Sequence, residues 1–413
     1  MLIDILLSIV IGIVIFFIIE LTIQKIVFSV REQFPWLITE KDEIPNLSKD
    51  GLAKFIPHGF DSELGWVRKP LTSNQEKGKH STTEWNVDKN SARKNPSFDN
   101  LNSLISCYGD SFTFSRQVND DETWPHYLSK SLNSNVLNFG VGNYGIDQSL
   151  LRLKREFPTN KTEIVVLAVV PETICRILSI WKHYYEYGNT FGFKPRFIIK
   201  ENKLVQLKNP IDNISKFEHY EDYLEYIKAN DFFYKNKFLK EKISFPYSIT
   251  ILKNFRRNFE IISWVRKIKQ LKKRKKDFSK IEWNTMKIIM QINLNWRVNL
   301  FQDPHSCKLL KMIIQEYVNY SKEMNFKPIF IFLPQKDDLM FIKNNFHFFK
   351  EFQNELKSIE DLTLLDVTDN LLHEKNLDDF YSDDNDYGGH FTKYGNKTIS
   401  ELIIGQLKNF NLI

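Results

Sequence analysis

Two side chains far apart in the sequence have the types that nucleophilic catalysis requires. Ser111 follows Gly109 and Asp110, directly after an apolar segment that predicts a strand and before one that predicts a helix. His390 lies near the C-terminus, shortly after Asp386. A serine hydroxyl is a weak nucleophile until a base takes its proton, and an imidazole base needs a carboxylate that fixes its tautomer. The sequence therefore predicts a triad of Ser111 as nucleophile, His390 as base and Asp386 as orienter.

The carboxylate of this triad has alternatives. Asp383 and Asp384 lie close enough to His390 in the sequence to compete with Asp386 for the same role. The serine is better defined, because a turn between strand and helix exposes its hydroxyl and lets its own backbone N–H face a developing oxyanion.

A glycine-rich loop could supply a second oxyanion donor. Residues 138–145 read Asn-Phe-Gly-Val-Gly-Asn-Tyr-Gly and follow a predicted strand, where glycine lets the backbone approach a ligand closely. The loop follows Ser111 by about thirty residues, the length of one strand-helix-strand unit. Both loops are therefore expected at the same edge of a parallel sheet, with one N–H of the second loop pointing at the reacting oxygen.

The segments around these residues alternate between strand and helix patterns. Strands are predicted at 104–108, 135–139, 163–170, 328–333 and 362–366, and helices at 122–132, 147–156, 307–324, 344–358 and in the segment that closes the chain. Such alternation predicts an α/β fold in which a parallel sheet is wrapped by helices. Its chemistry belongs at the carboxyl ends of the strands.

The alternation stops within residues 176–300, which predict a helical insertion into an α/β domain made of 101–175 and 301–413. Lysine and arginine dominate 265–276, and we interpret this run as a solvated helix face, with a contact to anionic lipid or nucleic acid as the alternative. The aromatic residues near the start of the insertion are expected in a core or lid rather than stacked on sugars. These are Trp181, Tyr184, Tyr185 and Tyr187.

The N-terminus predicts a single membrane-spanning anchor over 3–25, followed by a juxtamembrane linker over 26–50 and a β-rich lead-in over 51–100. The apolar stretch is long enough to cross a bilayer at about 1.5 Å per residue. A cleaved signal peptide is the alternative, but Asp4 is the charged residue before the apolar run and no small-x-small cleavage site follows it. Lys25 and Arg31 give a slight bias toward a cytoplasmic main domain.

The sequence gives little support for a metal site, a nucleotide cofactor or a nucleic-acid partner. Cys107, Cys175 and Cys307 are too widely separated for a C-x-x-C zinc motif, so buried thiols are expected and no metal site. The sequence contains no Walker loop and no GxGxxG strand-helix junction, so no cofactor is expected. The net charge of +6 is a small difference between 57 basic and 51 acidic residues, and no nucleic-acid partner is expected.

The motifs, in this order along the chain, resemble the SGNH (GDSL-like) hydrolase superfamily. They are Gly-Asp-Ser at 109–111, the glycine-rich loop at 138–145 and Asp386 before His390, and the resemblance covers roughly residues 100–175 and 325–410. The lead-in, with Leu-Gly-Trp at 64–66 and Ser-Ala-Arg at 91–93, is also similar to SGNH proteins encoded among bacterial surface-polysaccharide genes.

This resemblance implies a flavodoxin-like three-layer α/β/α fold and the triad given above. It also implies an oxyanion hole with three hydrogen-bond donors. The first is the N–H of Ser111, and the second is a backbone N–H that corresponds to Asn143, after Gly142. The third is an asparagine side chain in a later motif. The chain departs from the family at that third position, where Pro-Glu-Thr places Glu172, and an anionic Glu172 would oppose an oxyanion. The spacing Asp-x-x-x-His is also one residue longer than usual.

The resemblance predicts a serine esterase or O-acyltransferase that acts on an acyl ester, such as an acetyl ester, of a glycan through an acyl-enzyme. The alternative is a catalytically weak or inactive SGNH-fold protein that binds surface polysaccharide or helps to assemble it. Glu172 and the large insertion are the features that favour this alternative. Hydrolysis and transfer share the acyl-enzyme and differ only in the acceptor, so the sequence does not separate them.

Overall fold

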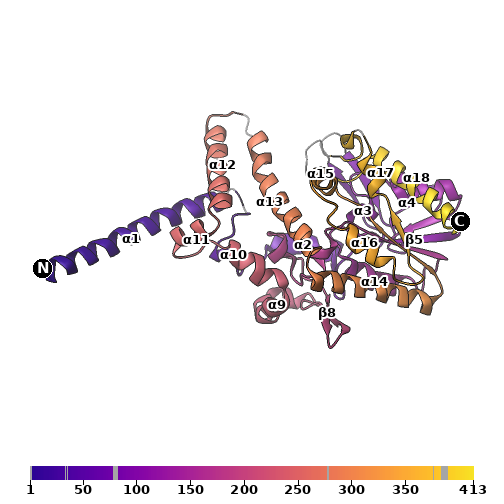
Figure 1. Ribbon diagram of the computed structural model, residues 1–413, viewed down its shortest axis with the longest axis horizontal. Helices are drawn as coiled ribbons and strands as arrows, with labels where there is room; N and C mark the ends of the chain where they lie inside the picture. The colour runs from indigo at the N-terminus through magenta and orange to yellow at the C-terminus, as the bar shows by residue number, and fades with distance from the viewer. Residues whose placement is uncertain are drawn as a thin grey trace.

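The computed structural model describes residues 2–32, 34, 36–77, 82–276, 279–374, 376–382 and 389–413, without the side chains of 279–288. Figure 1 shows a long N-terminal helix, α1, that projects from a larger part in which helices surround a sheet. The C-terminus lies at the end of the molecule opposite the free end of α1.

A parallel sheet of five strands forms the centre of this larger part. The strands are β5 (Ser103–Gly109), β6 (Asn135–Asn138), β7 (Ile164–Val169), β10 (Lys327–Phe332) and β11 (Thr363–Asp366). They lie in the order β11-β10-β7-β5-β6, and every neighbouring pair is parallel. Numbered along the chain, this is the 2-1-3-4-5 order of flavodoxin-like folds. The predicted α/β fold class is therefore confirmed.

Helices cover both faces of the sheet and make three layers. One face carries α5 (Ile146–Glu156), α14 (Pro304–Met324) and α16 (Lys350–Leu356), and the other carries α4 (Trp124–Leu132), α15 (Lys336–Asn344), α17 (Thr368–Leu372) and α18 (Lys393–Asn409). Strand β7 lies between the two layers, with Val165 and Leu167 in one core and Val166 and Ala168 in the other. A strand that is buried on both faces appears in the sequence as an unbroken apolar run.

The helix predicted over 344–358 is shorter than predicted, because beyond Asn344 only Lys350–Leu356 of that range form a helix, α16. Helix α15 ends at Asn344 and α16 begins at Lys350, because the residues between them turn Phe348 and Phe349 into the core. The ring of Phe349 lies 5.3 Å from that of Phe332 in strand β10. The free energy gained by burying two aromatic rings thus exceeds the free energy that a continuous helix would gain.

The lead-in contains a helix that was not predicted. Helix α2 (Lys49–His58) begins after Ser48, whose hydroxyl accepts a hydrogen bond from Gly51 N at 3.2 Å. Two hairpins follow, β1 (Phe60–Asp61) with β2 (Gly65–Trp66) and β3 (Ser73–Lys77) with β4 (Thr82–Asn86). A four-residue helix, α3 (Ser111–Phe114), comes directly after β5.

The insertion contains a hairpin as well as helices. The short helix α6 (Thr173–Arg176) leads into the insertion. Its helices are α7 (Lys182–Tyr185), α8 (Ser215–Glu218), α9 (Leu224–Asn230), α10 (Leu239–Glu241), α11 (Tyr247–Lys253), α12 (Phe255–Lys273) and α13 (Ser279–Leu300), and the hairpin pairs β8 (Arg196–Lys200) with β9 (Lys203–Leu207). The four aromatic residues predicted for a core or lid are buried. They are Trp181, Tyr184, Tyr185 and Tyr187.

Helix α1 (Leu2–Arg31) extends beyond the predicted anchor of 3–25 and into the predicted linker. It is long and apolar enough to cross a membrane, and no other helix of the described ranges meets that test. None of its most apolar 18-residue stretch is buried. Its last turns pack against the insertion instead, where Val27 and Val30 form a cluster with Ile261 and Val265 of α12.

Candidate active site

The turn that carries Ser111 is held by the residue before it. Ser111 begins α3, and Asp110 caps this helix by accepting a hydrogen bond from Phe112 N at 2.8 Å. The same buried carboxylate accepts from Val170 N at 2.8 Å, which connects the end of β5 to the end of β7. It also pairs with Arg176 at 3.3 Å. Asp110 therefore fixes the turn that positions Ser111.

Two glycines allow the loops after β5 and β6 to lie against their neighbours. A Cβ at Gly109 would lie 1.8 Å from Ala168 O, and a Cβ at Gly140 would lie 2.2 Å from Phe114 N. Val141 N donates to Gly109 O at 3.0 Å and joins the two loops. The glycine-rich loop thus lies beside the serine, as its position in the sequence predicted.

Ser111 and His390 form a hydrogen-bonded pair. His390 Nε2 lies 2.8 Å from Ser111 Oγ, although the residues are 279 positions apart in the chain. The imidazole packs on Phe112, with ring centroids 4.8 Å apart, and is partly buried. This geometry lets the imidazole take the hydroxyl proton directly.

The partner of the other imidazole nitrogen is Gln117, which was not predicted from the sequence. Gln117 Oε1 lies 3.0 Å from His390 Nδ1 and accepts hydrogen bonds from His390 N at 2.9 Å and from the Ser382 hydroxyl at 2.6 Å. Because a backbone N–H can only donate, the amide atom at this place must be the oxygen. A carbonyl oxygen can only accept, so Nδ1 carries the proton and Nε2 is free to accept from serine.

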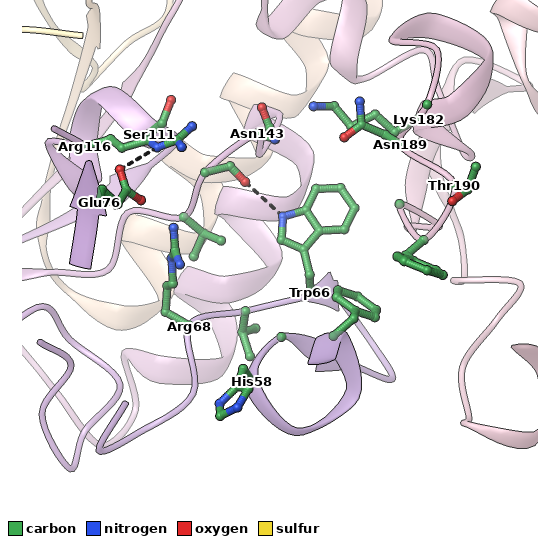
Figure 2. Close-up of a pocket in the computed structure, with 18 of the residues that line it drawn as sticks. His58, Trp66, Arg68, Glu76, Ser111, Arg116, Asn143, Lys182, Asn189 and Thr190 are labelled. Atoms are coloured by element: carbon green, nitrogen blue, oxygen red, sulfur yellow. Dashed lines mark hydrogen bonds and ion pairs between the residues drawn. The ribbon is translucent and has the colours of Figure 1, made fainter. Parts of the chain in front are cut away.

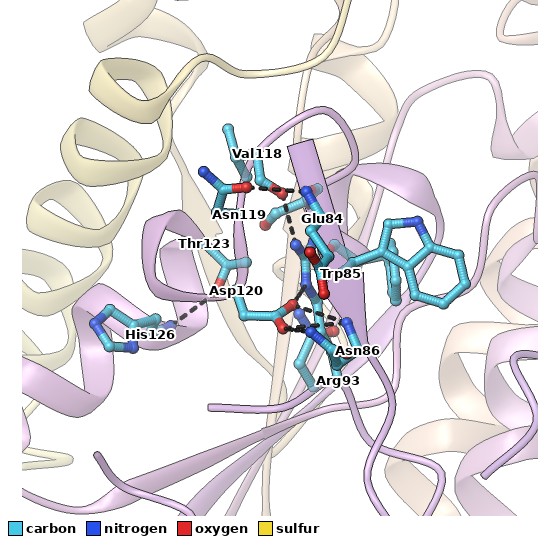
Figure 3. A network of polar contacts seen from close by, with 12 residues as sticks. Glu84, Trp85, Asn86, Arg93, Val118, Asn119, Asp120, Thr123 and His126 are labelled. Carbon is cyan, nitrogen blue, oxygen red and sulfur yellow. Dashed lines mark hydrogen bonds and ion pairs between the residues drawn. The ribbon is translucent and has the colours of Figure 1, made fainter. Parts of the chain in front are cut away.

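The loop that carries Gln117 is fixed by Arg93 (Figure 3). This buried guanidinium donates to the carbonyl oxygens of Phe114, Ser115 and Val118 at 2.6–2.7 Å and pairs with Asp120 at 2.8 Å. Ser115 and Gln117 both have positive φ, 57° and 71°, a backbone region that non-glycine residues seldom adopt. Arg93 thus stabilises the strained loop that aims Gln117 at the imidazole.

The predicted carboxylates lie outside the described residues. Asp386, Asp383 and Asp384 all fall within 383–388, between Ser382 and the described segment that resumes at residue 389. The role of Asp386 as orienter therefore stays a prediction.

Three backbone N–H groups beside Ser111 make no hydrogen bond within the described chain. They belong to Ser111 itself, Gly142 and Asn143, and all three residues line one cavity with His390. Trp66 Nε1 donates to Gly142 O at 2.9 Å, so that carbonyl points at the indole N–H (Figure 2). Because the peptide is trans, Asn143 N–H points the opposite way. These groups can donate to an oxyanion.

Glu172 is turned away from the cavity and is not among its lining residues. Its carboxylate pairs with Arg176 at 3.0 Å and accepts a hydrogen bond from the Tyr185 hydroxyl. Burial alone would raise the pKa of Glu172, but Arg176 and then Arg297 outweigh burial and lower it. The anion that the sequence placed near the oxyanion is thus neutralised by arginine.

The cavity has a volume of about 580 Å³ and draws its walls from three parts of the chain. The lead-in contributes Trp66, Arg68 and Glu76, the α/β part contributes the residues described above, and the insertion contributes residues 182 and 188–192. Figure 2 shows Arg68, Glu76 and Arg116 on the side of the cavity nearest to Ser111. None of these three was predicted, because single charged residues that are far apart in the chain form no sequence pattern.

The pKa of His390 lies below its usual range. Burial, followed by the positive charges of Arg116 and Arg176, lowers the pKa of His390 to about 3. A neutral imidazole with its proton on Nδ1 is ready to act as a base at neutral pH. An imidazolium beside two arginines is raised in free energy by their positive charges. Proton transfer from Ser111 is therefore favourable only when negative charge develops on the substrate at the same time.

No protein-family model matches the chain, and no curated protein sequence matches it. Two solved structures are similar over most of their length. A protein of the G-D-S-L family from Desulfitobacterium hafniense DCB-2, described as lipolytic, shares 12% identity at a TM-score of 0.32, over 73% of this chain and 98% of that one. An acetyl xylan esterase, AlAXEase, shares 10% identity at a TM-score of 0.35, over 74% and 99%. These TM-scores are too low to carry a functional conclusion.

Proposed function

We propose that this protein is a membrane-anchored serine esterase or O-acyltransferase that acts on acyl esters, such as acetyl esters, of a glycan. The observation that carries the proposal is the 2.8 Å pairing of Ser111 Oγ with His390 Nε2 beside backbone N–H groups that make no hydrogen bond to any described residue. The pair supplies an activated nucleophile, and the N–H groups supply an oxyanion hole.

The reaction has two half-reactions. His390 Nε2 takes the Ser111 proton while Oγ attacks the acyl carbon, and the carbonyl oxygen becomes an oxyanion beside the N–H groups of Ser111 and Asn143. The imidazolium then gives its proton to the departing sugar oxygen. In the second half, water or a sugar hydroxyl gives its proton to His390 and attacks the acyl carbon. The bond to Ser111 Oγ then breaks as the imidazolium returns a proton to Oγ, so hydrolysis and transfer differ only in the acceptor.

The orienting role has two candidates. Gln117 Oε1 accepts a hydrogen bond from Nδ1–H of His390 and fixes the tautomer, but its amide carries no charge to stabilise the imidazolium. Asp386 remains the proposed source of that charge. Their separate contributions can be measured with single variants.

Helix α1 is proposed as a retained single-pass anchor. Glu20, within α1, is only 2% exposed and accepts hydrogen bonds from the backbone N–H groups of Tyr247 and Ser248 in α11. Cleavage of α1 as a signal peptide would remove this carboxylate and the surface against which α11 packs. That contact favours the anchor over the signal peptide.

Labelling of detergent-purified protein with a fluorophosphonate tests the proposal, because this probe requires an activated serine. We expect labelling in the natural sequence, loss in Ser111→Ala and His390→Ala, and no change in Ser131→Ala, an exposed serine of α4. A well-folded protein without labelling would instead favour one that binds or assembles surface polysaccharide without turnover.

A further inference from the structure

Two arginines in the wall of the cavity carry more positive charge than their surroundings neutralise. The guanidinium of Arg68 lies over the rings of Trp85 and Phe114, 4.2 and 5.0 Å from their centroids. Within the described chain, Arg68 makes no ion pair or hydrogen bond. Arg116 binds Glu76 through Nε at 2.8 Å, yet its side chain is 49% exposed. Both guanidinium groups are therefore available to a ligand.

The charge balance of the wall favours an anion. Glu76 is the one carboxylate among the described lining residues, and it can offset one arginine. Lys182, another cation of the wall, is already paired with Glu186 at 2.6 Å. Burial, only partly opposed by Glu76, lowers the pKa of Arg68 to about 10, so the guanidinium keeps its charge at neutral pH.

We propose that the ester bound in this cavity is anionic, and that Arg68 and Arg116 hold an oxyanion, either carboxylate or phosphate, on its sugar part. This substrate class rests on the proposed function of the same site. A guanidinium fork matches both oxyanions in two parallel hydrogen bonds. The Nε1–H of Trp66 is already used by Gly142 O, which leaves the indole face for the apolar side of a sugar ring.

Paired substrates test this inference. Turnover of 4-acetoxybenzoate is compared with that of its neutral methyl ester, and 4-acetoxyphenyl phosphate distinguishes phosphate from carboxylate. We expect kcat/KM to favour an anionic ester, and Arg68→Gln to lower that preference roughly 10- to 100-fold. Arg274→Gln, an exposed arginine beyond α12, should leave the preference unchanged.

Direct binding keeps this inference separate from the proposed function. Calorimetric titration with glucuronate, glucose 6-phosphate and glucose needs no turnover, so it applies even if fluorophosphonate labelling fails. Binding of an anionic sugar over glucose, lost in Arg68→Gln, would support an anion site. Equal kcat/KM for anionic and neutral esters in a protein that labels at Ser111, or no binding preference in one that does not, would overturn it.

An independent observation concerns the surface beside α1. Five large apolar side chains between residues 245 and 259 are at least half exposed: Phe245, Ile249, Leu252, Phe255 and Phe259. We name this set the α11–α12 apolar patch. Such a concentration of exposed apolar side chains marks an interaction surface.

The patch lies beside α1, near the C-terminal end of the exposed apolar stretch of that helix. The ring of Phe245 is 6.3 Å from the rings of both Phe16 and Phe17 in α1. Glu20 follows in α1 and accepts a hydrogen bond from Ser248 N in the first turn of α11. Figure 1 shows α11 alongside α1. If α1 crosses a bilayer with its exposed stretch, the patch is at the level of the membrane surface.

Basic side chains accompany the patch. Arg256, Arg266 and Lys267 of α12 are exposed, while Ile261, Val265 and Ile268 on its opposite side are buried. Exposed aromatic residues beside basic ones are typical of helices that lie in the headgroup layer of anionic membranes.

We infer that the α11–α12 apolar patch lies in the same bilayer that α1 crosses and fixes the orientation of the catalytic domain on the membrane. The test uses full-length protein in vesicles of phosphatidylcholine with and without phosphatidylglycerol. A fluorescent label at Leu252→Cys is compared with one at Ile214→Cys, an equally apolar exposed site distant in the chain, both in a Cys307→Ser background.

Quenching of the label's fluorescence by lipid-attached nitroxides measures whether the labelled residue lies in the bilayer. We expect strong quenching at residue 252, stronger with phosphatidylglycerol, and little at residue 214. Equal quenching at both positions would overturn the inference. Shielding of residue 252 from both lipid and aqueous quenchers would overturn it in favour of a second copy or another protein on the patch.

Discussion

Replacing Gln117 should slow catalysis while leaving substrate binding in place. Gln117→Ala removes the acceptor 3.0 Å from His390 Nδ1, so the imidazole can turn or change tautomer. A neutral hydrogen bond contributes about 0.5–1.5 kcal/mol, and one to a charged group about 1.5–3 kcal/mol. The ring is charged only after proton transfer, so kcat should fall roughly 10- to 100-fold with little change in KM.

Gln117→Glu is the matched variant. A carboxylate at this position accepts the same hydrogen bonds and adds negative charge, so the pKa of His390 should rise from about 3. In the natural sequence kcat/KM should stay flat from neutral pH down to about pH 4, because the base remains unprotonated. In Gln117→Glu the loss of activity in acid should begin at higher pH.

Hydrolysis of an aryl acetate across a pH series measures both effects, and thermal unfolding of each variant controls for folding. The reasoning is refuted if Gln117→Ala keeps full kcat and Gln117→Glu keeps the natural pH profile. Loss of activity in Asp386→Ala alone would then assign the orienting role to Asp386.

Arg93→Met should lower the free energy of unfolding by about 3–5 kcal/mol, because it leaves the buried Asp120 without its cationic partner; urea unfolding measures the loss, and kcat should fall as well. Gly140→Ala should destabilise by about 1–3 kcal/mol, whereas Gly142→Ala, whose Cβ meets nothing within 4 Å, should leave Tm unchanged. Burial lowers the pKa of His183 to about 4, so between pH 6.5 and 4 only the unfolded chain takes up the proton. As the pH falls across that window, His183 should therefore lower the stability by about 3 kcal/mol, in addition to the effect of His390, and His183→Gln should remove its part of the slope in pH-dependent unfolding.

The sheet could be predicted because it depends on local pattern. A strand buried on both faces must be apolar throughout, as residues 164–169 are. The carboxyl ends of parallel strands share an edge, which places Ser111 beside the loop at 138–145. The spatial pairing of Ser111 with His390 followed from chemistry, since a nucleophilic serine requires a base.

The remainder of the site depends on tertiary contacts that leave no pattern in the sequence. Gln117 gains its role from a left-handed backbone that Arg93 stabilises, and neither residue belongs to a periodic segment. The hairpin β8–β9 was missed because Glu201 and Asn202 take positive φ in its turn without glycine. The wall of the cavity combines the lead-in with the insertion, and their distance in sequence hides that proximity.

Detection of an acyl group on Ser111 tests the central claim most directly. Full-length protein is mixed with an aryl acetate, quenched in acid, digested and examined by mass spectrometry. We predict an acetyl group on the peptide that contains Ser111, decaying once the ester is removed and absent from Ser111→Ala. Turnover with an unmodified Ser111, or acetylation of a different serine, would contradict the account.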